Sequence, residues 1–149
     1  MKSSSSVLST NLPSKVNLKI ALALLAIIIG GHIYIIYRPD SLLMFSWFHL
    51  LGLDKYVELA RHAFSELYVA DWVVYNLPTG LWLLSYMLII DAVWGNERKD
   101  FACKVFLYSL PCIAVASEFL QLFQLLPGTF DFADILSYLF ACVIFQLLK

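Results

Sequence analysis

The chain has 149 residues, of which 61% are hydrophobic and 14% are charged, and its formal net charge at pH 7 is -1. Soluble domains average about 45–50% apolar and about 25% charged residues, so a soluble fold of this length could not bury so much apolar surface. The near-neutral charge also excludes the basic footprint of a nucleic-acid-binding protein. We therefore expect an all-α polytopic membrane protein built as a single transmembrane domain.

The N-terminal part of the chain predicts a polar tail followed by a membrane helix. Residues 1–15 include a run of serines, and an uncharged apolar run extends from Ile20 to Tyr37. This run is longer than the about 7–15 residues of a signal-peptide core, so we predict a retained membrane helix over residues 16–37. The Arg38-Pro39-Asp40 segment ends that helix.

Two segments after the first span are typical of helices that lie in the membrane interface. Residues 41–52 are apolar but too short to cross a bilayer, because a spanning helix needs about 20 residues. Residues 54–67 place apolar and charged side chains at the spacing of an amphipathic helix. Both segments fit interfacial helices, and a re-entrant hairpin is the alternative for the first.

Three more apolar stretches predict the remaining spans, at residues 72–92, 103–123 and 131–148. In the first of these, Asn76 and Pro78 lie about one turn inside the helix, where proline predicts a kink. The kink either shapes packing or turns Asn76 and the opened backbone toward acidic side chains on the later spans.

The distribution of Lys and Arg orients the chain. Cytoplasmic loops carry the excess of these residues, so both termini are expected in the cytoplasm and the interfacial helices outside. The inner set is Lys2, Lys15, Lys19, Arg98, Lys99, Lys104 and Lys149, and the outer set is Arg38, Lys55 and Arg61.

Two polar pairs flank the turn between the last two spans. Each pair has i, i+3 spacing, which places both side chains on one face of a helix. Because the connection is short, these helices must be antiparallel neighbours, and the pairs should meet near the outer leaflet. A charged group inside a bilayer is costly and by default indicates a functional site. The predicted acidic cluster comprises Glu118, Gln121, Asp131 and Asp134, with Asn76 beside it.

Some of these residues also have purely structural interpretations. Asp131 is a good N-cap for the final helix, and Asp134 three residues later resembles a capping box. Glu118 lies too deep in its helix for capping. His32, inside the first span, either packs as a neutral side chain or pairs with a carboxylate as a proton-linked switch.

The spacing leaves the chemistry of the cluster open. Clustered carboxylates can bind a cation, which here would be a divalent ion at Glu118, Asp131 and Asp134. They can also perform acid–base chemistry on a lipid-borne substrate, or form a hinge that responds to pH or ligand. No catalytic residue or organic cofactor is identified, because the sequence has no readable nucleophilic triad and no phosphate loop.

The acidic cluster resembles the signature of a known family. The pattern is Glu-x-x-Gln at 118–121, a glycine turn, and Asp-x-x-Asp at 131–134 opening a final helix. It resembles the VanZ-like group of small bacterial four-span membrane proteins over residues 101–149, while the earlier spans agree in architecture. The chain departs from the family at Thr129, where a basic residue is usual, and after Asp134, where Asn and Gly are frequent.

The resemblance implies a bacterial cytoplasmic membrane protein associated with the cell envelope. One branch of the family is tied to resistance against lipidated glycopeptide antibiotics, and no reaction is assigned to the group. The leading hypothesis is therefore a non-enzymatic protein that binds a lipid-like ligand or a protein partner through the acidic cluster. The alternatives are an oligomeric pore or sensor subunit of a stress or phage-defence system, and a metal-assisted enzyme acting on a lipid-linked substrate.

Overall fold

The computed structural model describes residues 12–94 and 101–149, and over these ranges it is helical without strands. The all-α class is therefore confirmed for the described part of the chain. Residues 1–11, most of the predicted polar tail, lie outside it. The helices are α1 (Leu12–Tyr37), α2 (Leu43–Leu50), α3 (Asp54–Ala63), α4 (Asp71–Tyr75), α5 (Leu77–Trp94), α6 (Phe101–Leu122) and α7 (Phe132–Leu148).

Within residues 12–94 and 101–149, three helical stretches are long and apolar enough to cross a membrane, as expected of a membrane protein. They are Lys15–Tyr37, Asp71–Trp94 and Phe101–Leu122, and they coincide with three of the predicted spans. Helix α7 is also apolar but has 17 residues, fewer than the about 20 of a typical span.

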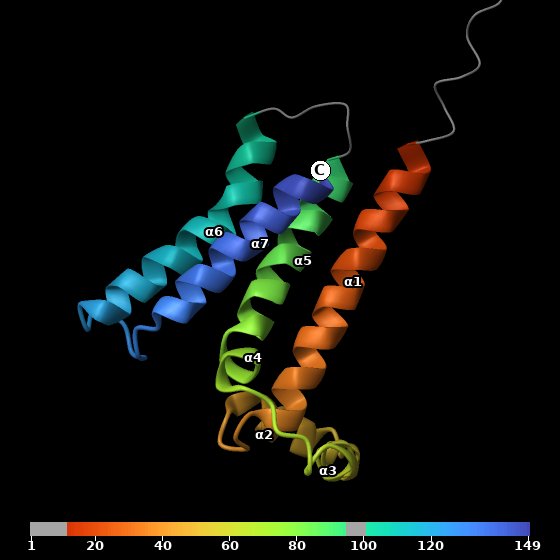
Figure 1. Cartoon of the computed structure of the whole chain (residues 1–149), viewed down its shortest axis with the longest axis vertical. Helices are drawn as coiled ribbons and strands as arrows, with labels where there is room; N and C mark the ends of the chain where they lie inside the picture. The colour runs from red at the N-terminus through yellow and green to blue at the C-terminus, as the bar shows by residue number, and fades with distance from the viewer. Residues whose placement is uncertain (1–11, 95–100) are drawn as a thin grey trace, which may run out of the picture.

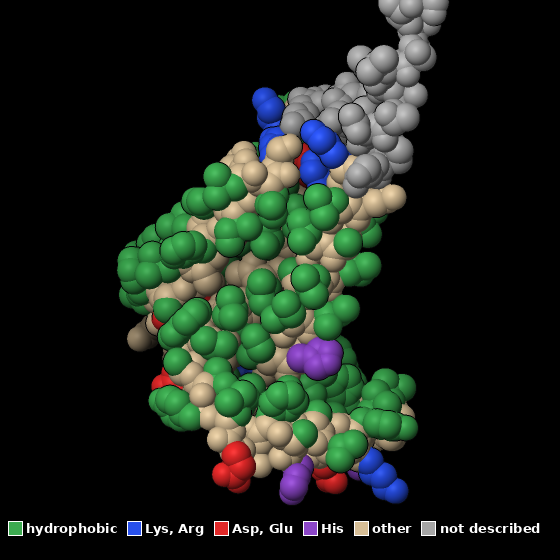
Figure 2. Space-filling view, turned by 45° about the vertical axis from the view of Figure 1, so that its right-hand side comes forward, with side chains coloured by type: hydrophobic (Ala, Val, Ile, Leu, Met, Phe, Trp, Pro, Cys, Tyr) green, Lys and Arg blue, Asp and Glu red, His purple; other side chains and the backbone are tan. Residues whose placement is uncertain are grey.

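Helix α5 lies in the middle of the bundle and packs against α1, α6 and α7. Figure 1 shows α1 and α5 running side by side, α6 and α7 forming a hairpin, and α2 with α3 lying across one end. The core lies between α1, α5 and α7, where Ala23, Met87, Leu88 and Phe145 are buried. Outside this core, hydrophobic side chains cover the sides of the bundle and most charged ones lie toward its ends (Figure 2).

The second span is interrupted, and the interruption positions a polar side chain. Helix α4 ends at Tyr75, Asn76 is its C-cap, and α5 begins at Leu77. Pro78 lies in the first turn of α5, where its missing N–H costs no helical hydrogen bond. The predicted kink is thus a short break just before the proline.

Several other boundaries differ from the sequence prediction. Helix α1 begins at Leu12, so residues 12–15 belong to the helix and not to a tail. Helix α2 covers less than the predicted 41–52, and α3 ends at Ala63, short of residue 67. Propensity and periodicity fix the presence of a helix more firmly than its ends.

An ion pair and a close backbone approach hold α1 against α5. The Lys19 ammonium pairs with the Asp91 carboxylate, and these side chains are 12% and 4% exposed. Farther along, Gly30 lets the Trp82 indole approach so closely that a Cβ at residue 30 would lie 2.9 Å from Nε1. Small residues allow this kind of approach between membrane helices.

Substituting Gly30 should separate α1 from α5. We expect Gly30→Leu to lower the free energy of unfolding by about 1–3 kcal/mol, because the new side chain overlaps the Trp82 indole. Gly31→Leu is the matched control, since a Cβ there meets nothing within 4 Å. Thermal unfolding of both variants in a nonionic detergent measures the difference, and equal stabilities would contradict the packing described.

Candidate functional site

The buried side-chain amide of Asn76 lies at the centre of a cluster of polar side chains. Its Nδ2 donates to Asp131 Oδ2 at 2.8 Å and to Asp134 Oδ1 at 3.1 Å. Asn76 is 6% exposed, so both hydrogen bonds are shielded from solvent. The break between α4 and α5 is therefore joined directly to the first turn of α7. Of the two roles that the sequence allowed for the kink, the structure has the one in which Asn76 faces the acidic side chains.

Thr79 extends the cluster along α5. Its Oγ1 lies 2.6 Å from the Asn76 carbonyl oxygen and 3.0 Å from Asp134 Oδ1, and its single proton can serve one acceptor at a time. The same atom lies 3.1 Å from Ser137 Oγ. Gly80 permits this closeness, because a Cβ there would lie 3.0 Å from the Ser137 carbonyl oxygen.

Glu118 joins the cluster from α6. It is 4% exposed, and its Oε2 accepts a hydrogen bond from the Asp131 backbone N–H at 3.1 Å. Asp131 caps α7 as predicted, because its Oδ1 accepts from the Ala133 backbone N–H at 2.8 Å. The cap and the cluster therefore share one residue. Asp134 turns its side chain to Asn76 and Thr79, which is not the arrangement of a capping box.

Gln121 supports the turn between α6 and α7. Gly128 in that turn has φ 136°, and a Cβ built on it would lie 2.8 Å from Gln121 Cδ. The glutamine side chain thus packs directly over the glycine backbone. Its role in this geometry is to shape the loop that brings Glu118 and Asp131 together.

His32 lies outside the cluster. One ring nitrogen, Nδ1, lies 2.7 Å from the Ile28 carbonyl oxygen on the same helix, and the side chain is exposed. It lines an apolar recess with residues of the segment between α3 and α4, including Phe64 and Leu67. Across the residues that the structure describes, the hydrogen bonds of the cluster come from α4 to α7, without a contribution from α1.

Sequence reasoning missed Thr79, Ser137 and Tyr138. Thr79 follows Asn76 by three residues, and Ser137 follows Asp134 by three, so both continue a polar helix face. Tyr138 lies close enough to Asp134 and Glu118 to interact with them electrostatically, and its side chain lies near Thr79. The i, i+3 spacing from Asn76 and Asp134 could have identified Thr79 and Ser137 as members of the same polar face. The polar cluster hereafter means Asn76, Thr79, Glu118, Asp131, Asp134, Ser137 and Tyr138.

The carboxylates of the polar cluster have no cationic side chain as a partner within the described ranges. The ion pairs formed there are Lys19 with Asp91, Arg61 with Asp40, and His49 with Asp54. Among the same residues, no group of three or more His, Cys, Asp or Glu side chains is placed to hold a metal ion. The cluster therefore offers hydrogen-bond acceptors on carboxylates that are buried at Glu118 and half-buried at Asp131 and Asp134.

An apolar groove adjoins the polar cluster between α5 and α7. Its volume is about 550 Å³, within the about 300–1,000 Å³ range of small-molecule sites. Asn76 and Ser137 belong both to the groove wall and to the polar cluster, so the groove and the cluster meet at these two side chains. The groove is lined by Trp72, Asn76, Leu77, Gly80, Leu81, Leu84, Ala133, Leu136, Ser137, Phe140, Ala141 and Ile144.

No protein-family model matches this chain, and no curated protein or solved structure matches it at a significant level.

Exchanging the Asn76 donor and the Asp134 acceptor tests the hydrogen bonds at the centre of the cluster. Asn76→Asp removes the donor and places a third carboxylate beside Asp131 and Asp134, so we expect a loss of about 1–3 kcal/mol in unfolding free energy. Adding Asp134→Asn restores a donor opposite residue 76 and should recover part of that loss. Thermal unfolding checks both steps, with Asp134→Asn alone as the control. An Asn76→Asp protein as stable as the original would contradict the hydrogen bonds assigned to Asn76.

Proposed function

We propose that the chain is a four-span protein of the bacterial cytoplasmic membrane, with α7 as the fourth span and both termini in the cytoplasm. In the part of the chain that the structure describes, three helices qualify as spans by length and composition. Helix α7 packs on α5, and its buried Phe145 lies in the same core as Met87 of α5. A shorter span is accommodated by local thinning of the bilayer. In this orientation α2 and α3 lie at the outer interface.

We further propose that the protein binds a lipid-like ligand at the polar cluster, with the hydrocarbon chain of the ligand in the α5–α7 groove. The observation that carries this proposal is a set of carboxylates, with Glu118 buried and Asp131 and Asp134 half-buried, that have no cationic partner among the described residues. They lie beside an apolar groove whose wall includes Asn76 and Ser137. A bilayer supplies hydrocarbon chains to an apolar groove, and a head group with positively charged hydrogen-bond donors would complement the carboxylates.

The contacts among the signature residues agree with the VanZ-like resemblance. Glu118 of the first motif pair and Asp131 of the second are joined by a hydrogen bond, although thirteen residues separate them. The glycine turn and Gln121 hold the two helices at that spacing. Such a motif would serve to form one ligand site from both of its pairs, at the end of the α6–α7 hairpin. We propose a VanZ-like envelope protein on this basis.

Two photoactivatable probes test the proposed ligand class. One is hexadecylamine carrying a diazirine on its chain, and the other is the corresponding hexadecanoic acid. Charge-assisted hydrogen bonds should favour the amine by about tenfold in binding to protein in nonionic detergent. Mass spectrometry of the labelled peptides should place the chain at groove residues such as Leu136 and Phe140.

Matched variants separate the groove from the cluster. Leu136→Trp fills the groove and should reduce labelling by both probes, whereas Leu139→Trp, on the same helix but outside the groove lining, should not. Glu118→Gln with Asp134→Asn, which leaves Asp131 as the remaining carboxylate, should reduce the preference for the amine and leave labelling by hydrocarbon intact. Equal labelling by amine and acid in the original protein would contradict a role for the carboxylates in ligand recognition.

A further inference from the structure

Arg38 lies at the end of α1 with its charged group held between two aromatic rings. Its guanidinium carbon is 5.2 Å from the centroid of the Tyr34 ring and 4.8 Å from that of the Tyr75 ring. The rings come from α1 and α4, so both helices fix the position of the cation. Cation–π contacts of this kind orient a guanidinium while leaving its N–H groups free to donate in the plane of the group.

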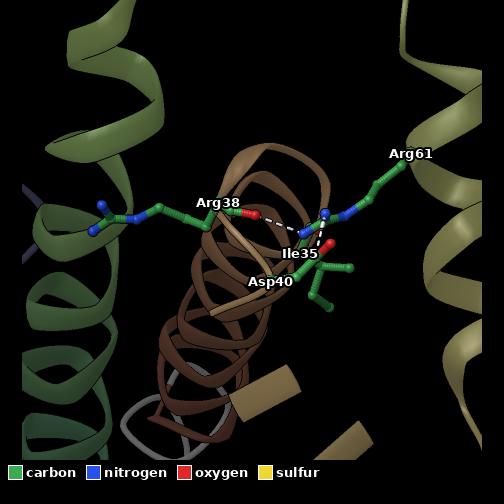
Figure 3. Close-up of polar contacts among 4 residues, drawn as sticks. All are labelled: Ile35, Arg38, Asp40 and Arg61. Atoms are coloured by element: carbon green, nitrogen blue, oxygen red, sulfur yellow. Dashed lines mark hydrogen bonds and ion pairs between the residues drawn. The ribbon is translucent and has the colours of Figure 1, made fainter. Parts of the chain in front are cut away.

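The nearest acidic residue in the sequence is already used by another arginine. Asp40 forms an ion pair with Arg61 of α3. Arg61 also donates to the Ile35 carbonyl oxygen at 3.0 Å and to the Arg38 carbonyl oxygen at 2.6 Å. Figure 3 shows the Arg38 side chain extending away from Arg61 and Asp40. Arg61 therefore fixes the backbone of Arg38 and also pairs with the acidic residue nearest to Arg38 in the sequence.

Arg38 consequently retains unused hydrogen-bonding capacity. Its Nε is buried and is the one buried side-chain nitrogen or oxygen without a hydrogen-bond partner among the described residues. None of the ion pairs within those ranges includes the Arg38 guanidinium. A buried donor without an acceptor is costly, and native structures rarely leave one without a reason. An anionic acceptor would satisfy this donor and also pair with the guanidinium charge.

The position of Arg38 indicates the source of that acceptor. It directly follows the apolar stretch Lys15–Tyr37, which is long enough to cross a membrane, so its side chain lies at head-group level. Tyrosines such as Tyr34 and Tyr75 are typical of this interface. Phosphate is the anion that every phospholipid places there, and guanidinium groups bind phosphate oxygens through paired N–H donors.

We propose that Arg38 is a phosphate-binding residue that holds one membrane phospholipid at the C-terminal end of α1. Tyr34 and Tyr75 position the guanidinium, and Arg61 fixes the backbone that carries it. This inference depends on α1 crossing the membrane. It does not depend on the polar cluster, on the orientation of the chain or on the ligand proposed above.

Native mass spectrometry of the full chain in nonionic detergent tests the proposal with dioctanoyl phosphatidylglycerol as the probe. We expect a one-to-one adduct, and about tenfold weaker binding of dioctanoylglycerol, which has the same tails but no phosphate. Arg38→Gln should weaken phosphatidylglycerol binding by about tenfold, and Arg38→Lys should restore part of it, because lysine keeps the charge but not the planar fork.

Lys55→Gln is the matched control, since it removes a positive charge from exposed α3 at the same end of the molecule and should leave binding within about twofold. A similar loss in Lys55→Gln would show a general electrostatic effect and overturn the proposal. Equal binding of the phospholipid and the diacylglycerol by the original protein would overturn it without any variant. Displacement of the lipid by an equal concentration of inorganic phosphate would assign the subsite to free phosphate and contradict a lipid partner.

Discussion

The side-chain amide of Asn76 joins two helix ends that would otherwise present unpaired polar groups inside an apolar protein. It occupies the C-cap of α4 and donates to carboxylates of the N-cap and first turn of α7. Few donors are available at such a position, because most neighbouring side chains are apolar. The break in the second span, the close approach at Gly80 and the capping of α7 are therefore parts of one arrangement. Removing the amide would leave Asp131 without its donor from the α4–α5 break, and Asp134 with the Thr79 hydroxyl as its remaining donor from α5.

The other contacts of the bundle keep this arrangement in place. Helix α1 is held to α5 by the Lys19–Asp91 ion pair and by the packing of Gly30 against Trp82. Buried ion pairs contribute little net stability, but losing one partner is costly because the remaining charge is left unpaired. The pair therefore fixes the position of α1 along α5 more than it stabilises the fold. With α1 fixed, Arg38 stays beside Tyr75, the residue that precedes Asn76.

Much of the polar cluster could be predicted from the sequence because its members are local to one hairpin. A short connection and two i, i+3 pairs are enough to bring Glu118 near Asp131, and Asp131 carries its own capping signal. His32 could not be placed in the same way. Helix α1 is apolar over nearly its whole circumference, so its sequence does not reveal which face meets the bundle. The structure turns His32 to an exposed position away from the carboxylates.

Other features depend on contacts between distant residues. The Lys19–Asp91 pair joins positions 72 residues apart, and neither residue has a local pattern that indicates its partner. The break at Asn76 was signalled by Pro78, but its hydrogen bonds to Asp131 and Asp134 depend on the packing of α5 against α7. The groove has no sequence signature, because most of its lining residues are ordinary apolar residues of α4, α5 and α7.

The start of α5 lies directly against the first turns of α7, and the polar cluster is enclosed between them. Disulfide cross-linking in native membranes measures this contact, with Thr79→Cys and Ser137→Cys in a chain whose three cysteines are replaced by alanine. Because the two hydroxyl oxygens lie 3.1 Å apart, we expect rapid cross-linking within one chain. The absence of a cross-link, or cross-links formed between chains alone, would contradict it.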